Sequence, residues 1–270
     1  MKIGITIVLA ILGFVSYLFL NVVIRRMVAG VRSREDYDED VDGKMTDAEK
    51  KAFEESKEVE AGKLKIGFGE VKAEYGKRFY IMALLGAVLG GLAGFFFGLS
   101  VDTVIYFIFF GVLAVIAFID MDTMEIPPSL NVIILGLGII SMVLTLTGVQ
   151  KSDVTIIDRL IGAACVSGFL LIVTLIVKGA FGGGDIKLMA AAGVLLGWKG
   201  VLIGFLIGLF IGAGVGIVLI ARRKKGGREH IPFGPSLCIG LVAAVLVGEP
   251  LVNWYIDLIK AMMPNTYGGY

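Results

Sequence analysis

Long apolar runs separated by short polar turns set the pattern of this chain. A helix needs roughly 20 apolar residues to cross the hydrocarbon core of a bilayer, and seven runs meet or approach that length. They span Ile3 to Ile24, Phe79 to Leu99, Thr103 to Ile119, Asn131 to Val149, Ile156 to Val177, Val201 to Ala221 and Phe233 to Ile256. The pattern predicts an all-α, polytopic membrane helix bundle.

Basic residues near the span ends predict an eighth crossing, because Lys and Arg mark the cytoplasmic side. They cluster at Arg25 and Arg26, at Lys77 and Arg78, and from Arg222 to Arg228. Four spans carry the chain from Arg78 back inside at Lys178, so a single further span would leave the Arg222 cluster outside. The conflict disappears if the apolar stretch Ile186 to Trp198 also crosses.

This eighth span is short. At 1.5 Å per residue its 13 or so residues cover only about 20 Å, less than the hydrocarbon core of about 30 Å. The loop before it must therefore dip in, or the bilayer must thin, so Asp185 is drawn to membrane depth. The chain then begins outside, in a cell inner or plasma membrane, and Asp120 and Asp185 share the cytoplasmic side.

The layout predicts four parts. Residues 1–27 form the first transmembrane span, and residues 28–78 form a charged cytoplasmic loop that contains no cysteine. Residues 79–260 form a seven-span membrane domain that holds the aspartates, and residues 261–270 form a short tail. Within the charged loop, Thr46 followed by Glu49 resembles a capping box, so we expect one short helix there.

Composition supports a membrane protein and excludes several classes of function. Hydrophobic residues make up 57% of the chain and charged residues 18%, and the mean hydropathy is +0.87, far from a soluble domain. A net charge of +1 gives no indication of nucleic-acid binding. A single histidine, His230, and two cysteines argue against a zinc site, a disulfide scaffold or a Ser-His-Asp set.

Two carboxylates at membrane depth are the candidate chemistry. An ionised Asp in hydrocarbon costs roughly 2.5–3.5 kcal/mol, so such residues are usually paired or face a watery cavity. Asp120 ends one apolar span and Asp185 begins the short one. Two carboxylates held close tend to share a proton, and such a pair can activate water while protonating a leaving amide nitrogen.

Each aspartate lies beside a backbone break. Pro127 and Pro128 bar a regular helix after Asp120, and Gly182, Gly183 and Gly184 permit positive φ angles and close backbone approach before Asp185. Lys187 follows two residues later. We regard Asp122, Pro127, the three glycines and Lys187 as supporting or substrate-binding residues. Asp122 also competes with Asp120 for the role in the pair, and Glu125 is expected to be a solvated acid.

Three stretches resemble the type IV prepilin peptidase family, the bacterial relatives of archaeal preflagellin peptidases among the GxGD aspartyl proteases. They are IDMDTMEIPPSLN at Ile119 to Asn131, GGGDIKLMAAAG at Gly182 to Gly193 and PFGPSLCIG at Pro232 to Gly240. With the eight-span layout, the resemblance covers nearly everything from Phe79 onward. The presenilin branch fits less well, because no Tyr-Asp motif precedes the GGGD loop and no Pro-Ala-Leu motif follows it.

The resemblance implies an intramembrane aspartyl endopeptidase with Asp120 and Asp185 as its catalytic pair. It would cleave the short basic leader from prepilin or pseudopilin substrates at the cytoplasmic face, in contact with the lipid bilayer and without nucleic acid. Proteolysis would need no cofactor and no metal. Many members also N-methylate the new amino terminus with S-adenosylmethionine. The cysteine tetrad of their first loop is missing here, but some members lack it, so methyl transfer stays open and would be the one step to need that cofactor.

Two other functions stay open at this point. Paired aspartates relay protons in transporters, and glycine-broken helices can line a substrate path, so a proton-coupled membrane transporter is the main alternative. A divalent metal site built from Asp120, Asp122 and Asp185 is the third, since carboxylate oxygens suit hard cations.

Overall fold

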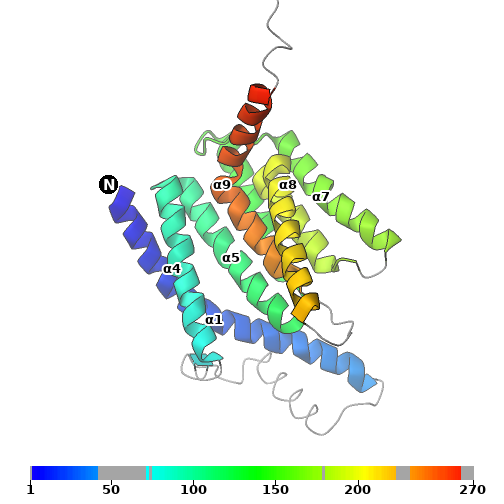
Figure 1. The fold of residues 1–270 in the computed structure, drawn as a ribbon. Coiled ribbons are helices and arrows are strands. Elements are labelled where there is room, and N and C mark those ends of the chain that lie inside the picture. Colours follow the sequence, from blue (N-terminus) through cyan, green and yellow to red (C-terminus); the bar gives the residue numbers. More distant parts are fainter. Residues whose placement is uncertain (1, 42–70, 73–74, 178–179, 223–231, 263–270) are drawn as a thin grey trace, which may run out of the picture.

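The computed structural model describes residues 2–41, 71–72, 75–177, 180–222 and 232–262, and this part of the chain is helical with short connections (Figure 1). The helices are α1 (Lys2–Val41), α4 (Lys77–Phe97), α5 (Val101–Thr123), α6 (Pro128–Leu146), α7 (Ile156–Ile176), α8 (Gly183–Arg222) and α9 (Gly234–Met262). The predicted all-α bundle is confirmed.

Local sequence signals explain where several helices begin. The side chain of Ser100 accepts the backbone N–H of Thr103 and caps α5. Thr155 and Asp158 form a reciprocal capping box at the start of α7, which satisfies two backbone donors that a helix start leaves free. Pro128 occupies the first turn of α6, where its missing N–H costs nothing.

Glycines at every fourth residue let neighbouring helices approach closely. In α4, Gly86 and Gly90 face α1, and a Cβ at Gly13 of α1 would overlap the carbonyl of Gly86. In α8, Gly208 packs on the backbone of Ser236 and Leu237 of α9, and a Cβ there would lie 2.9 Å from the Ser236 oxygen. In a bilayer the hydrophobic effect does not drive helices together, so close backbone packing of this kind contributes to their association.

Helix α8 is two limbs that fold back on each other. Gly197 has φ 72° and ψ 175°, which no helix contains. The ring of Phe233 lies 5.4 Å from that of Phe181, just before α8, and it also contacts Gly212 in the second limb. Both limbs therefore reach the same end of the bundle, so the short first limb, Gly183 to Leu196, is the predicted short span.

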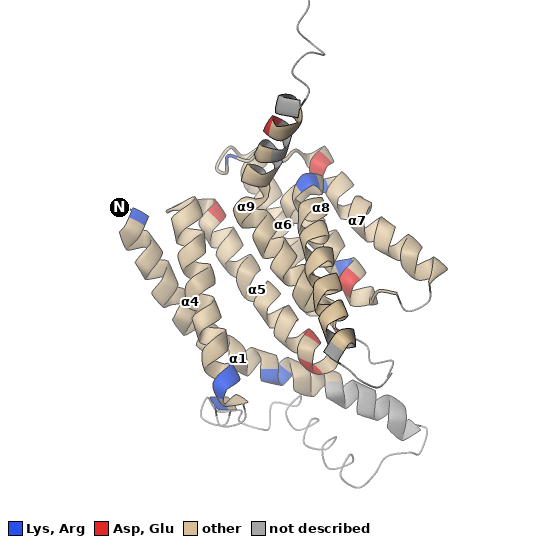
Figure 2. Cartoon of the chain, viewed as in Figure 1, with Lys and Arg blue, Asp and Glu red and all other residues tan. Residues whose placement is uncertain are grey.

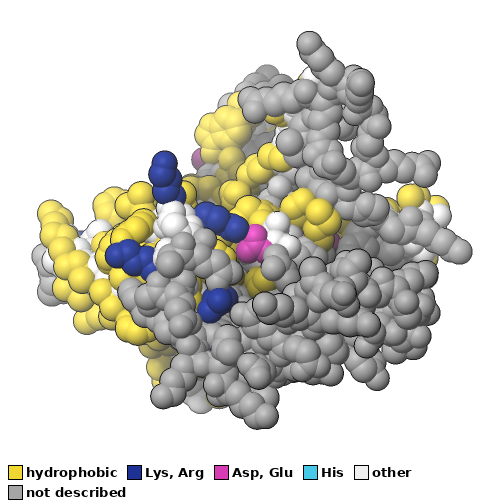
Figure 3. All heavy atoms as spheres, turned by 90° about the horizontal axis from the view of Figure 1, so that it is seen from below, with side chains coloured by type: hydrophobic (Ala, Val, Ile, Leu, Met, Phe, Trp, Pro, Cys, Tyr) yellow, Lys and Arg dark blue, Asp and Glu magenta, His cyan; other side chains and the backbone are white. Residues whose placement is uncertain are grey.

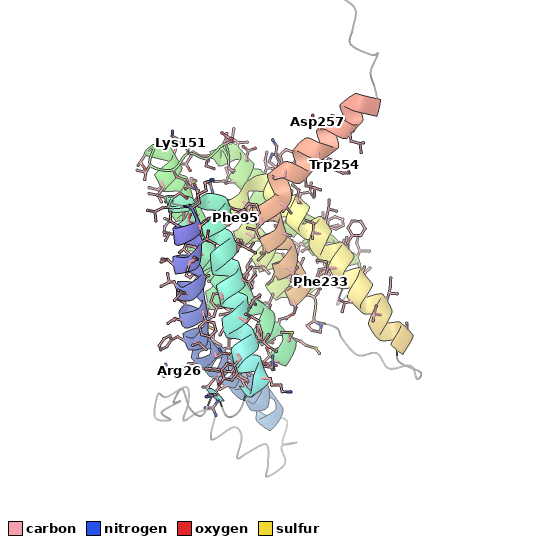
Figure 4. The ribbon with its side chains drawn as sticks, turned by 60° about the vertical axis from the view of Figure 1, so that its left-hand side comes forward. Arg26, Phe95, Lys151, Phe233, Trp254 and Asp257 are labelled. Atoms are coloured by element: carbon pink, nitrogen blue, oxygen red, sulfur yellow. The ribbon has the colours of Figure 1, made fainter. Side chains whose placement is uncertain are left out.

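The outer surface is that of a membrane protein. Six helices of the described chain are long and apolar enough to cross a membrane, with α8 counted once, and the apolar helix Gly234–Gly248 is shorter. Large apolar side chains point outward: Ile176 and Phe210 are each 77% exposed. Most charged side chains lie toward the two ends of the helices (Figure 2). We call the end with Arg26 the basic end and the opposite one the Lys151 end (Figure 4).

The first helix is longer than the sequence pattern predicts. It continues past residue 27 to Val41, so the first part of the expected charged loop is helical. The short helix expected around Thr46 and Glu49 lies outside the described residues.

Candidate functional site

Asp120 sits in the last turn of α5, where the helix is forced to stop. Met124 caps the helix with φ 55°, the one positive φ among the described non-glycine residues, and its N–H bonds the Asp120 carbonyl at 2.9 Å. Pro127 then interrupts the helical path before α6 begins. The Asp120 side chain is only 5% exposed, and its Oδ2 accepts the backbone N–H of Gly234 at 3.0 Å.

Asp185 lies in the first turn of α8 and is 7% exposed. Its Oδ2 accepts the backbone N–H of Gly182 at 3.2 Å, which folds the glycine loop back onto the carboxylate. Gly184 packs against Ile126, where a Cβ would lie 2.8 Å from the Ile126 Cβ. The glycine loop is therefore pressed against the break between α5 and α6, because it carries no side chain at this point.

Aromatic and polar contacts join the three sequence stretches at the basic end. Phe181 packs on Phe233, and the next residue, Gly234, donates to Asp120. The contact of Gly184 with Ile126 adds a third link, between the start of α8 and the loop after α5. Both carboxylates are therefore buried at one end of the bundle, on segments that touch.

The supporting residues occupy different places. Asp122 forms an ion pair with Arg78, with 2.8 Å between Nη1 and Oδ1. Figure 3, a view of the molecule from below, shows basic and acidic side chains next to each other. Lys187 and Glu125 are exposed, as are Gly182 and Gly183. Pro127 is half-buried and precedes α6.

The three-carboxylate cation site is not formed. Asp122 is held by Arg78, and within the described residues no three His, Cys, Asp or Glu side chains gather into a cation site. The Asp120 and Asp185 pair therefore stands without the third oxygen ligand that this alternative required.

Two contacts of the site went unnoticed in the sequence. Gly234 belongs to the Pro-Phe-Gly-Pro stretch, which marked a resemblance but gave no indication of contact with Asp120. Asn131, at the end of the first stretch, donates from Nδ2 to the Gly184 carbonyl at 3.4 Å. Its one signal was a polar amide inside an apolar helix, 5% exposed in the structure.

Comparisons with known proteins relate the chain to one family. The pattern of the type IV leader peptidase family matches residues 107–217, which include Asp120 and Asp185. A Bacillus subtilis (strain 168) protein named prepilin leader peptidase/N-methyltransferase is 30% identical over 175 residues, 65% of this chain and 68% of its own length. Proteins of the same name from Legionella pneumophila and Aeromonas hydrophila are each 31% identical.

The chain spans 62% of the Legionella protein and 63% of the Aeromonas protein, and 66% and 68% of this chain is covered. No solved structure matches the chain. The segment that matches the family, residues 107–217, contains the end of α5, the glycine loop and most of α8. By its sequence match and by the site that these segments build, the chain belongs to the type IV leader peptidase family.

Proposed function

We propose that this chain is a membrane-embedded aspartyl endopeptidase that cleaves the short basic leader from type IV prepilin-like or pseudopilin substrates. The observation that carries the proposal is that Asp120 and Asp185 are both buried at one end of a membrane bundle, on segments that the contact of Gly184 with Ile126 brings together. The names of the relatives supply the substrate class.

Hydrolysis divides between the two carboxyl groups. The ionised group accepts a proton from a water molecule while the water oxygen adds to the carbonyl carbon of the scissile amide. The protonated group then gives its proton to the leaving nitrogen as the C–N bond breaks. Main-chain donors hold one oxygen of each carboxylate, from Gly234 and Gly182, so both groups are oriented before substrate arrives.

The cytoplasmic side is the proposed face of cleavage. Basic residues of the described chain concentrate near the span ends at the end with the two aspartates: Arg25, Arg26, Lys77, Arg78, Lys187 and Arg222. Exposed lysines at the opposite end are Lys2, Lys151 and Lys199, fewer than the basic residues at this end. Under the positive-inside rule the basic end faces the cytoplasm, where the leader of an unprocessed substrate would lie.

The test uses the purified full chain and a prepilin-like substrate. Asp120→Asn and Asp185→Asn each remove the acid–base function at one site with little change in size, so we expect cleavage to fall by at least about 10²-fold. Amino-terminal sequencing of the product measures it. Asp122→Asn is the matched control, since it loses only a partly exposed ion pair, worth about 0–1 kcal/mol. Substantial cleavage by either of the first two variants would overturn the aspartyl mechanism.

Methyl transfer is the second activity to score, because the relatives' names include N-methyltransferase. The same reaction, supplied with S-adenosylmethionine, would add the mass of a methyl group to the new amino terminus of the product. A product that keeps its unmodified mass would limit the proposal to proteolysis.

A further inference from the structure

The glycine loop before α8 is flanked by two buried oxygen atoms that lack a hydrogen-bond donor. Asp185 Oδ1 and Asn131 Oδ1 are each shielded from solvent, and no group in the described part of the chain donates to either. The other oxygen of Asp185 and one oxygen of Asp120 are held by the N–H groups of Gly182 and Gly234. Leaving a buried acceptor unpaired is costly, so both oxygens call for a donor that the fold does not provide.

The two residues that carry these oxygens are both neighbours of Gly184. Asn131 reaches Gly184 through its Nδ2, 3.4 Å from the Gly184 oxygen, and this bond directs the amide oxygen away from that carbonyl. Asp185 is the next residue along the chain, and its other oxygen is already held by Gly182. The bond from Asn131 to Gly184 therefore brings the two side chains that carry the orphan oxygens close to each other, between the first turn of α6 and the first turn of α8.

A water molecule is the donor that suits these oxygens. Water has two O–H donors, and buried waters typically bridge polar groups that would otherwise be unsatisfied. Both oxygens are covered, which favours a small donor over a peptide main chain. A water held against Asp185 is also placed to lose a proton to that carboxylate.

Resting on the proposed function, we propose that Asn131 is a third catalytic residue, whose amide oxygen holds the hydrolytic water against Asp185. The amide nitrogen meanwhile fixes the glycine loop through Gly184. In this arrangement Asn131 acts on the attacking oxygen and not on recognition of the leader, so its loss changes kcat and leaves KM alone.

The variant is Asn131→Leu, which keeps the approximate volume and removes both polar atoms. We expect kcat to fall about tenfold to a hundredfold, the range that a misplaced reacting group costs, with KM within about twofold of the parent. Asn21→Leu is the matched control. Asn21 is likewise buried, 3% exposed, and its amide bonds main-chain carbonyls of α1 and α4, on helices other than those that carry the two aspartates. This control should keep its kcat.

Inhibitor binding separates the water role from a general structural role. In a leader-junction peptide with hydroxyethylene in place of the scissile amide, the hydroxyl stands in for the water. We expect the parent protein to bind this peptide more tightly than its deoxy counterpart, and Asn131→Leu to lose that preference. Asn131→Ser, a milder change, gives the same comparison if the leucine variant fails to fold.

Three results would decide against the inference. They are an unchanged kcat in Asn131→Leu, a rise in KM alone, or an intact preference for the hydroxyl peptide. If Asp120→Asn and Asp185→Asn are inactive while Asn131→Leu is fully active, the inference fails and the proposed function stands. If the two aspartate variants still cleave, the proposed function itself fails.

Discussion

At the residue scale, the two aspartates are held by main chain and not by basic side chains. Gly234 donates to Asp120 at 3.0 Å and Gly182 donates to Asp185 at 3.2 Å. A neutral N–H donor orients a carboxylate and favours its ionised form less strongly than a neighbouring Arg would. Arg78 pairs with Asp122 instead, so its charge lies outside the pair that would exchange a proton in the proposed mechanism.

The contact between Gly234 and Asp120 gives a sharp prediction. A Cβ at Gly234 would lie 2.6 Å from the Asp120 Oδ2, so Gly234→Ala must displace the carboxylate or the start of α9. We expect cleavage to fall by roughly 10²-fold, the cost of moving a reacting group by about 1 Å, while the protein still inserts and folds. Initial cleavage rates at saturating substrate measure the effect.

Gly136→Ala in α6 is the control for that substitution, because a Cβ there meets nothing within 4 Å. Replacing an interior helical glycine by alanine should raise stability by about 0.5–1 kcal/mol and leave the rate unchanged. Full activity in Gly234→Ala would contradict the tight fit at Asp120.

At the element scale, α7 fastens the turn between the two limbs of α8. Arg159 is 2% exposed, and its guanidinium donates to the carbonyls of Val194 and Leu195 at 2.9 and 3.0 Å and to Ser141 Oγ at 3.0 Å. These carbonyls end the short limb, where a cation also meets the negative end of the helix dipole. The limb that begins near Asp185 is therefore anchored at its far end.

Arg159→Met tests this anchor. It leaves two helix-end carbonyls and a buried hydroxyl without their donor, so we expect the free energy of unfolding to fall by about 2–4 kcal/mol. The free energy of unfolding of Arg159→Lys should lie between those of the parent and Arg159→Met, because an ammonium cannot reproduce the planar fork of donors. Thermal unfolding in detergent measures both. Lys151→Met, at an exposed site at the same end, should change little; equal losses in all three would contradict the anchor.

The short limb also shows what the sequence could predict about elements. Charge and length alone required an extra crossing between Ile186 and Trp198, and the helix break at Gly197 agrees with that prediction. The sequence did not indicate that Arg159 is buried, since a basic residue near the start of an apolar run is typical of an interfacial position. Only packing of α6, α7 and α8 placed its guanidinium in the interior.

At the scale of the whole molecule, the bundle separates two polar ends. Asp120 and Asp185 lie with the basic end, and Gln150 joins Ser141 to Asp102 through its amide at the Lys151 end, with bonds of 3.0 and 2.6 Å. Many large apolar side chains are exposed between the ends, where few charged residues lie (Figure 2). The proposed topology, with the amino terminus outside, therefore puts the whole aspartate site on the cytoplasmic side.

Labelling of single cysteines in intact cells tests the topology. After Cys165→Ala and Cys238→Ala, a membrane-impermeant maleimide should label Lys151→Cys in intact cells, because this site is exposed at the outer end. Glu125→Cys, exposed at the basic end, should react only once the membrane is permeabilised. The reverse pattern would invert the topology and move the proposed cleavage to the outer face.

By itself the sequence determined the apolar segments, their number and the two acids at their ends, because hydrocarbon length and the cost of a buried charge act on residues one segment at a time. The tertiary structure decided which groups meet: Gly234 with Asp120, Asn131 with Gly184, and Arg159 with the end of the short limb. These partners are distant in the chain and carry no local pattern. Their contacts depend on how whole helices pack, so no single segment could indicate them.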